Sequence, residues 1–491
     1  MHQSKFVSSL SNSGILIAIL TYCILIKFLF IMYAPPLPDE AYYWLWSKRI
    51  DFSYYDHPPL SMWLQHLFSS LISNKKILLR IVPVIASIII LLIIYLWVKR
   101  LSFYRNIEDY LITILLATSI PVFNIFFSVS FPDPVLICTL VLSGFFYHLY
   151  SQEKRLFNNN KHFCWYLSVL FFALALLSKY NALLFGIGIF VHLILKKRER
   201  ENLILSKHFL LAIILVLLIF SPVIYWNARN DFASFGFNLD KRLSFEFNWY
   251  NIIENLFIFS FSLVLSFSPV LFMALFKNYQ KTNNKKHSSM GIEASISVLF
   301  VTIIFCLILT LFAQPLYYWA IPAFVMLIPY LSALIKKRSH RIIHCVYGLF
   351  ITTILFFNTV IYPVSLFFGK ADRETAILYG WDSISKKIST EKQRYDIKKI
   401  LFSDYRLGSL YAFHSEDFSI DVLMAKRETQ FDLWRDEDQQ LDSLILVDKD
   451  FPLNSKIRSI YTDIKFLKDI DVKIKQSQIK TYELYLGVNG N

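Results

Sequence analysis

Long apolar segments recur along most of this chain and are separated by short polar loops. A bilayer crossing needs about 20 mainly apolar residues. Windows of that kind lie near residues 14–33, 77–98, 110–128, 134–150, 163–178, 180–195, 208–227, 251–276, 293–312, 316–335 and 342–363. The sequence therefore predicts an α-helical polytopic membrane protein with about eleven transmembrane helices. Two pairs of windows, 163–178 with 180–195 and 293–312 with 316–335, leave the count open because their members are nearly adjacent.

The basic residues are distributed as expected for a membrane protein. The formal net charge of +14 comes from Lys and Arg in short runs between the windows, such as Lys99-Arg100 and Lys336-Lys337-Arg338. These runs follow every second window, which is the pattern of cytoplasmic loops. We therefore expect membrane lipids as partners and no nucleic acid. With a cytoplasmic N-terminus, the alternate loops, including the long ones at 34–76 and 228–250, lie on the external face.

The composition changes after about residue 364, where charged residues become frequent. Residues 399–402 and 444–447 are typical of short buried strands, and residues 382–390 are typical of a helix. The sequence thus predicts a transmembrane domain at 1–363 and a small external soluble α/β domain at 364–491. The five cysteines have no CxxC spacing, and neither a disulfide framework nor a zinc site is expected.

A polar, aromatic and proline-rich loop, residues 36–60, follows the first window. It begins with Asp39 and Glu40, and an acidic residue at a membrane edge indicates function by default. Asp39 is a candidate general base, which would take a proton from an attacking hydroxyl. The acidic pair is also suited to start a helix, and both roles are compatible. The aromatic run at 42–46 is consistent either with an interfacial belt or with sugar stacking.

The same loop ends in Asp56 and His57, which precede a diproline that holds the chain extended. Asp56 is a candidate substrate ligand. His57 is suited to bind a phosphate when protonated or to shuttle a proton, and a plain surface histidine is the alternative. Asp133 stands between two prolines where the fourth window begins. We expect it to cap a helix, with a substrate-binding role as an additional possibility.

Two further external turns contribute candidates. Lys179 is suited to neutralise the negative charge that develops on a lipid-phosphate leaving group, although snorkelling to the interface is an alternative. Arg80, at the start of the second window, is a weaker candidate of the same kind. Gln314, Tyr317 and Tyr318 offer an amide and aromatic rings to sugar hydroxyls, or belong to an interface belt. These residues all fall on the external face of the expected topology.

Several motifs of other enzyme and transporter classes are missing. The sequence has no P-loop, GxGxxG, HExxH or GxSxG motif. ATP-driven transport is therefore not expected. A soluble nucleotide sugar is also disfavoured as a donor, because the candidate residues face away from the cytoplasm. The remaining rival from another class is a transporter or flippase of lipid-linked sugars, which typically shows inverted repeats and charges at mid-depth in the bilayer.

Taken in order, these motifs resemble the dolichyl-phosphate-mannose protein mannosyltransferase superfamily. This is glycosyltransferase family 39 with its bacterial relatives, including the lipid A aminoarabinose transferases, and its fold is of the GT-C type. The resemblance covers roughly residues 14–363 and rests on the acidic pair, the aromatic run, the HPPL element, the R-x-x-P start at 80–83, the external Asp133 and Lys179. The segment RETQFDLW, residues 427–434, is also similar to one in bacterial members.

The resemblance implies a polyprenyl-phosphate sugar donor, undecaprenyl in bacteria, and a lipid or glycan acceptor outside the inner membrane. Asp39 would be the general base with Glu40 beside it, and His57 and Lys179 would hold the donor phosphate. Aminoarabinose transferases have a Glu-Lys pair where this chain has Asp56-His57. We therefore do not predict aminoarabinose, and expect another sugar to be transferred to lipid A, lipopolysaccharide or another glycan.

The expected mechanism is a single displacement with inversion at the anomeric carbon. No cofactor is required by it, although a divalent cation held by Asp39, Glu40 or Asp133 is a further option. Transfer to protein, as in O-mannosylation, is an alternative activity. The expected location is the bacterial inner membrane, with the active site and the C-terminal domain on the periplasmic side.

Overall fold

The computed structural model describes residues 2–101, 104, 106–152, 158–196, 203–239, 248–282, 290–435, 442–451 and 453–489. The chain divides into two compact units. The helical unit comprises Met1–Phe28, His57–Leu64 and Arg80–Thr353, and the sheet unit comprises Leu29–Asp56, Gln65–Leu79 and Ile354–Asn491. One of the points where the chain passes from one unit to the other lies between Asp56 and His57, so the loop at 34–76 contributes to both units.

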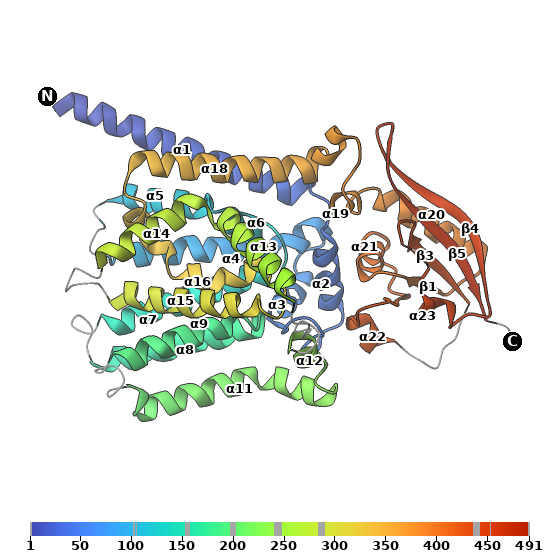
Figure 1. Cartoon of the computed structure of the whole chain (residues 1–491), viewed down its shortest axis with the longest axis horizontal. Helices are drawn as coiled ribbons and strands as arrows, with labels where there is room; N and C mark the ends of the chain where they lie inside the picture. Colours follow the sequence, from blue (N-terminus) through green and yellow to red (C-terminus); the bar gives the residue numbers. More distant parts are fainter. Residues whose placement is uncertain are drawn as a thin grey trace. The chain divides into compact units, whose positions relative to one another are not determined.

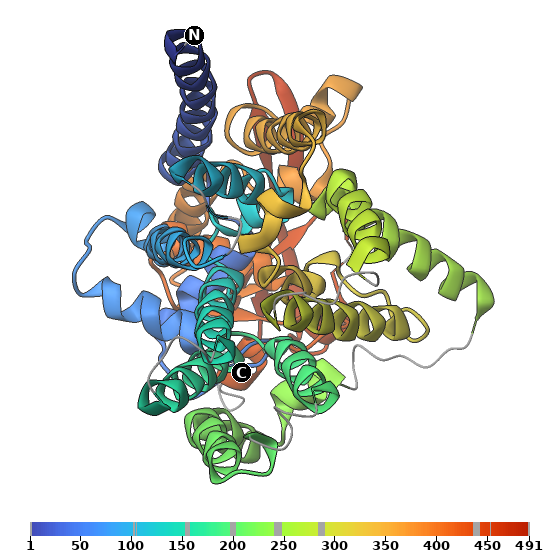
Figure 2. The same ribbon diagram turned by 90° about the vertical axis from the view of Figure 1, so that its left-hand side faces the viewer.

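The helical unit is built from apolar helices that run side by side, as Figures 1 and 2 show. Along the chain, these helices occur at the positions of the predicted apolar windows. The elements that lie wholly or largely in this unit are α1 (His2–Tyr33), α3 (Leu60–Ser69), α4 (Lys75–Val98), α5 (Ile107–Thr118), α6 (Pro121–Phe126), α7 (Asp133–Ser151), α8 (Asn158–Ser178), α9 (Ala182–Leu195), α11 (Lys207–Arg229), α12 (Ala233–Leu239), α13 (Trp249–Phe267), α14 (Pro269–Thr282), α15 (Met290–Leu309), η2 (Tyr317–Ala320), α16 (Ile321–Val325), η3 (Ile328–Tyr330), α17 (Leu331–Leu334) and α18 (Arg338–Phe356).

Within the described residues, eight helices are long and apolar enough to cross a membrane, or nine if one bent pair is a single span. The three remaining windows of the expected eleven are also helical, but they are short or broken. At 110–128 a break separates α5 from α6, and at 316–335 the helix bends by 63°. Helix α9 has 14 residues, which is roughly 21 Å and shorter than the hydrocarbon core.

The two pairs of closely spaced windows, whose count the sequence left open, form separate elements. Helices α8 and α9 are separate elements, and α15 ends before the bent pair begins. Close backbone contact holds neighbouring helices at Gly348 of α18, where an added Cβ would lie 1.8 Å from the carbonyl oxygen of Ser119. A hydrogen bond of 2.9 Å between the hydroxyls of Tyr22 and Thr353 joins α1 to α18.

The sheet unit contains one five-stranded sheet in the order β2-β1-β3-β5-β4. Strands β2, β1 and β3 are parallel, while β5 runs antiparallel to both β3 and β4. The elements of this unit are α2 (Pro38–Lys48), η4 (Phe357–Ile361), η5 (Val364–Phe368), α19 (Arg373–Ala376), α20 (Trp381–Arg394), β1 (Lys399–Phe402), α21 (Tyr405–Ser415), β2 (Ile420–Val422), α22 (Gln430–Trp434), β3 (Ser443–Asp448), α23 (Ser455–Arg458), β4 (Asp463–Ile474) and β5 (Ser477–Val488).

The predicted strands at 399–402 and 444–447 and the predicted helix at 382–390 are confirmed as β1, β3 and α20. Strand β3 is buried along its whole length, as its apolar run requires. Successive side chains of β1 and β3 point to opposite faces of the sheet. Leu401 and Ile445 belong to one apolar cluster, while Phe402 packs against Tyr411 of α21 at 5.4 Å between ring centroids.

Helix α21 lies close to the sheet because Gly408 has no side chain. A Cβ at this position would lie 2.9 Å from Val422 and 3.3 Å from Phe402. The helix begins immediately after β1, at Asp404, whose carboxylate accepts a hydrogen bond of 2.9 Å from the amide of Arg406. This cap fixes Tyr405 in the first turn. Helix α2, from the loop that follows the first apolar window, packs against α21 in the same unit.

Candidate active site

The ten candidate residues are divided between the two units. Asp39, Glu40 and Asp56 belong to the sheet unit. The residues that belong to the helical unit are His57, Arg80, Asp133, Lys179, Gln314, Tyr317 and Tyr318.

Asp39 and Glu40 occupy the first turn of α2, which begins at Pro38. Proline is favoured there because it has no N–H to leave unsatisfied. Glu40 is fully buried and accepts a hydrogen bond of 3.0 Å from the amide of Leu37. The expected helix-starting role is therefore observed for Glu40. Asp39 is half-buried and makes its contact outside its own helix.

The aromatic run of α2 is a packing surface. Tyr42, Tyr43, Trp44 and Trp46 are all buried, which disagrees with both an interfacial belt and an open sugar-stacking face. Trp44 packs against Phe413 at 5.0 Å, and Trp46 stacks on Tyr54 at 4.7 Å. The sequence alone does not distinguish such a buried aromatic surface from an interfacial belt, because both place several aromatic residues on one short helix. Their burial holds α2, and with it Asp39, against α21.

Tyr405 of α21 donates a hydrogen bond of 2.9 Å from its hydroxyl to Oδ1 of Asp39. Within the described chain this is the only hydrogen bond that Asp39 accepts through its side chain, so Oδ2 is available to another donor. Tyr405 is held in place by Tyr42, at 4.8 Å between ring centroids, and by its position next to the cap of α21. A residue 366 positions away thus orients the candidate base.

Burial raises the pKa of Asp39 above that of an ordinary carboxyl, because the charged form is less well solvated. The Tyr405 hydrogen bond lowers this pKa, nearby Asp56 raises it, and Arg427 and Arg406 lower it. The net shift is upward. A carboxylate with a raised pKa is a stronger base, which suits removal of a proton from a hydroxyl.

Asp56 forms an ion pair with Arg427. The carboxylate of Asp56 is buried, and the guanidinium of Arg427 also lies over the ring of Tyr405, 5.0 Å from its centroid. The arginine therefore neutralises Asp56, while Asp39 is bound by a neutral phenol. An ion pair with Asp39 would have lowered its pKa more strongly and weakened it as a base.

Several hydrogen bonds join the segment 427–434 to the loop that follows the first apolar window. Gln430 accepts one of 2.8 Å from the amide of Tyr55, and its own amide donates one of 2.7 Å to the Tyr42 hydroxyl. The Tyr55 hydroxyl donates to Glu428 at 3.3 Å. Thr429 caps α22 and orients the segment. The resemblance of this segment to bacterial relatives thus has a structural counterpart in its contacts with Asp56 and its neighbours.

Asp133 and Lys179 of the helical unit bind each other. The ammonium of Lys179 donates to both carboxylate oxygens, at 2.8 and 2.9 Å, and the two side chains are only 7% and 2% exposed. The expected N-cap role of Asp133 is wrong, because Pro132 occupies the cap position and Asp133 lies in the first turn of α7. The charge of this buried cation attracts the carboxylate more strongly than a single cap hydrogen bond would.

The Lys179 turn contacts the segment that contains Tyr317 and Tyr318. The ammonium lies 4.7 Å from the ring centroid of Tyr318, and the side chain of Asn181 donates a hydrogen bond of 3.3 Å to the Trp319 carbonyl. Tyr317 packs edge-on against Tyr318 at 5.4 Å. The helical unit therefore brings Asp133, Lys179 and Tyr318 together, as their common membrane side led us to expect.

The remaining candidates differ in burial. Gln314 is exposed and lies in the irregular segment before η2. Arg80 is 1% exposed within α4, and His57 is half-buried just before the diproline. Among the described residues, no group of three or more His, Cys, Asp or Glu is arranged to hold a metal ion.

Sequence reasoning missed Tyr405 and gave Arg427 no role. Tyr405 is one tyrosine among 28 and stands in a soluble segment far from the first loop, so no local pattern distinguishes it. Arg427 opens the segment that resembles bacterial relatives, and that resemblance was a usable signal. Both residues gain their importance from tertiary contacts with α2 and the loop that follows it.

Comparison with known proteins supports the expected fold. Residues 56–226 match the family model described as dolichyl-phosphate-mannose-protein mannosyltransferase. ArnT from Cupriavidus metallidurans in the apo state is similar, with a TM-score of 0.62, 13% identity and coverage of 98% of this chain and 100% of that one. The same protein bound to undecaprenyl phosphate gives a TM-score of 0.60 and 13% identity, and the match covers 98% and 99% of the two chains. No curated protein matches the sequence.

These findings confirm the predicted resemblance to the mannosyltransferase superfamily and the predicted GT-C fold. Together with the apolar helices, they identify a multi-pass membrane protein with a small C-terminal sheet.

Proposed function

From this shared fold we propose that the chain is a membrane glycosyltransferase that moves a sugar from a polyprenyl phosphate, undecaprenyl in bacteria, to an envelope acceptor. The acceptor would be lipid A, lipopolysaccharide or another glycan at the periplasmic side of the inner membrane. The fold of ArnT, which has been solved with undecaprenyl phosphate, supports the choice of donor. The observation that carries the proposal is the hydrogen bond between Tyr405 and Asp39 at a carboxylate whose pKa is raised.

Asp39 acts as the general base in this proposal. Its Oδ2 atom accepts the proton of the acceptor hydroxyl while that oxygen attacks the anomeric carbon. The bond from this carbon to the phosphate oxygen breaks in the same step, which inverts the configuration. The proton ends on Asp39, and the polyprenyl phosphate leaves with the negative charge. Tyr405 holds Oδ1, so that the carboxylate keeps one orientation during the transfer.

Cations of the helical unit are assigned to the donor phosphate, with His57, Arg80 and Lys179 as the candidates. A positive charge near the departing phosphate stabilises the charge that develops in the transition state. Lys179 has Asp133 as its partner in this structure, so its charge is partly neutralised before any donor binds. Tyr317, Tyr318 and Gln314 are assigned to sugar hydroxyls, and Glu40 and Asp56 support the loop that carries Asp39.

The test is mass spectrometry of lipid A, glycans and proteins from cells that carry the wild type or Asp39→Asn at matched protein levels. We expect one sugar modification to disappear, because loss of a general base slows transfer by a factor on the order of 10²–10⁴. The matched control is Asp51→Asn, which changes an acidic residue in the same loop outside the proposed cluster. An unchanged glycan profile with redistributed polyprenyl-linked sugar would instead indicate a transporter.

A further inference from the structure

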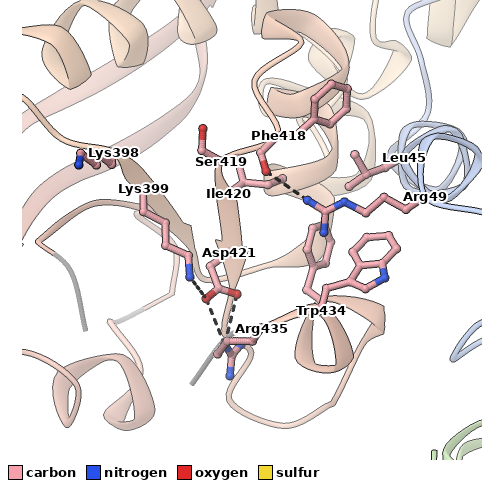
Figure 3. A pocket seen from close by; sticks show the side chains of 11 residues that line it. Leu45, Arg49, Lys398, Lys399, Phe418, Ser419, Ile420, Asp421, Trp434 and Arg435 are labelled. Atoms are coloured by element: carbon pink, nitrogen blue, oxygen red, sulfur yellow. Dashed lines mark hydrogen bonds and ion pairs between the residues drawn. The ribbon is translucent and has the colours of Figure 1, made fainter. Parts of the chain in front are cut away.

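A pocket lies within the sheet unit, near the end of α2 that is farther from Asp39. Its volume is about 300 Å³. Arg49, at the C-terminal end of α2, is ten residues beyond Asp39, which is roughly 15 Å along a helix. Figure 3 shows Arg49 and Trp434 on one side of the pocket and Lys399, Asp421 and Arg435 on the other. The pocket is therefore separate from the contact between Asp39 and Tyr405.

The described lining of this pocket carries four basic side chains, Arg49, Lys398, Lys399 and Arg435, and one acidic side chain, Asp421. Asp421 is only 8% exposed and is bound by Lys399 and Arg435, each at 3.2 Å. Arg435 is also paired at 3.3 Å with Asp432, which lies outside the lining, so two acidic side chains balance two of the four positive charges. The excess of two positive charges, on Arg49 and Lys398, favours an anionic ligand.

Arg49 has N–H donors that could bind an anionic ligand. It donates one long hydrogen bond of 3.4 Å to the carbonyl of Phe418, and the guanidinium lies 4.7 Å from the ring centroid of Trp434. An arginine side chain has five N–H donors in a fixed fork that matches the oxygens of a phosphate or carboxylate. Arg49 is exposed, so the N–H groups that it does not use within the protein are open to a ligand.

Lys398 adds a cation at the rim. It is exposed, and within the described part of the chain it makes no ion pair. The rings of Trp434 and Phe418 lie on the side of the pocket that carries Arg49, and Lys398 lies on the opposite side (Figure 3). Aromatic faces pack well against the apolar face of a sugar ring, and the neighbouring cations then reach an anionic substituent.

We propose that this pocket binds an anionic saccharide, a sugar that carries a phosphate or carboxylate group. Arg49 would bind the anionic group through its fork, Lys398 would add a long-range attraction, and Trp434 would contact the sugar ring. One side of the pocket is formed by residues at the end of α2, the helix that carries the candidate base. A charged part of the acceptor glycan bound in the pocket would therefore be held near this base. Only this last role rests on the proposed function, since binding itself does not require transfer.

Isothermal titration calorimetry on the full chain in nonionic detergent tests the proposal. The protein carries Asp39→Asn, so that no turnover contributes heat. The probes are glucose 6-phosphate, glucuronate, inorganic phosphate and glucose. We expect the two charged sugars to bind, glucose to give no binding, and inorganic phosphate to bind at least about threefold more weakly than glucose 6-phosphate because it lacks a ring. Preference between the first two probes identifies the anionic group.

Arg49→Gln should lower the affinity for the charged sugars by about tenfold or more, and Lys398→Gln by about threefold. Arg49→Lys keeps the charge without the fork and should give an intermediate loss, which separates binding from misfolding. Lys465→Gln, an exposed lysine of β4, is the control and should leave the affinity unchanged. Equal binding of glucose and its phosphate, or wild-type affinity in a folded Arg49→Gln variant, would overturn the proposal.

The two proposals fail in different ways. Binding that depends on Arg49 in a protein with no transferase activity would leave the pocket intact and remove its acceptor role. Sugar transfer that depends on Asp39, without Arg49-dependent binding of any charged probe, would remove the pocket alone.

Discussion

The buried acidic residues of the two units differ in the groups that bind their carboxylates. In the helical unit, Asp133 is paired with Lys179, and both charges are buried and neutralised by each other. In the sheet unit, the cation Arg427 pairs with Asp56, whereas Asp39 is bound by the neutral hydroxyl of Tyr405. A direct ion pair stabilises a carboxylate and weakens it as a base, while a phenol orients it at a smaller cost in basicity. This difference is consistent with the proposed role of Asp39 as the base, whereas Asp133 is the ion-pair partner of Lys179.

The largest expected effect follows from breaking the pair in the helical unit. Asp133→Ala leaves Lys179 buried without its carboxylate, and loss of one partner of a buried ion pair costs about 3–5 kcal/mol. Thermal unfolding in detergent should show a large decrease in Tm. The double variant Asp133→Ala with Lys179→Met should lose less stability than the sum of the losses in Asp133→Ala and Lys179→Met measured separately. Additive losses would show that the two residues do not stabilise each other.

Arg427→Gln should have the next largest effect, because it leaves Asp56 buried without its cation. We expect a loss of stability of about 1–3 kcal/mol. Arg427 also lowers the pKa of Asp39, so its removal raises that pKa further. The base works only when deprotonated, and the acid limb of the pH–rate profile should therefore move to higher pH. Arg427→Lys keeps the charge and should move the limb less. A limb that stays in place or moves to lower pH contradicts the assignment.

Tyr405→Phe should cost less stability than Arg427→Gln, while it should move the acid limb in the same direction and at least as far. The variant keeps the ring but loses the hydroxyl that donates to Asp39, at a cost of about 1 kcal/mol. Because this hydrogen bond lowers the pKa of Asp39, the acid limb should again move to higher pH. Tyr411→Phe, in the same helix, removes a hydroxyl bonded to Asp417 at 3.1 Å and is the matched control. Equal shifts in both variants would argue against a role specific to Tyr405.

The smallest expected effect concerns an exposed ion pair of the sheet unit. Lys75 and Glu416 are 2.8 Å apart, but the Glu416 side chain is 65% exposed. Glu416→Gln should change stability by roughly 0–1 kcal/mol, since solvent and salt screen such pairs. Thermal unfolding at low and high salt measures the change. A loss comparable to that of Asp133→Ala would show that exposure does not separate structural pairs from marginal ones in this protein.

The sequence alone determined the membrane-spanning part of the fold, because apolar length is a local property. It also predicted β1, β3 and α20, whose apolar patterns are continuous in the chain. The membrane side of Asp133, Lys179 and Tyr318 was inferred from alternating charge, and the structure brings these three together within the helical unit.

Only the tertiary structure decided which side chain binds each carboxylate. Residue 405 is 366 positions from Asp39, and Arg427 is 371 positions from Asp56, so neither contact has a trace in local spacing. The burial of the aromatic run was decided in the same way, by the packing of α2 against α21. Hydropathy is a property of one segment and its transfer out of water, so it can be read from the local sequence. A hydrogen bond or ion pair requires two particular groups within about 3 Å of each other, which depends on the tertiary structure.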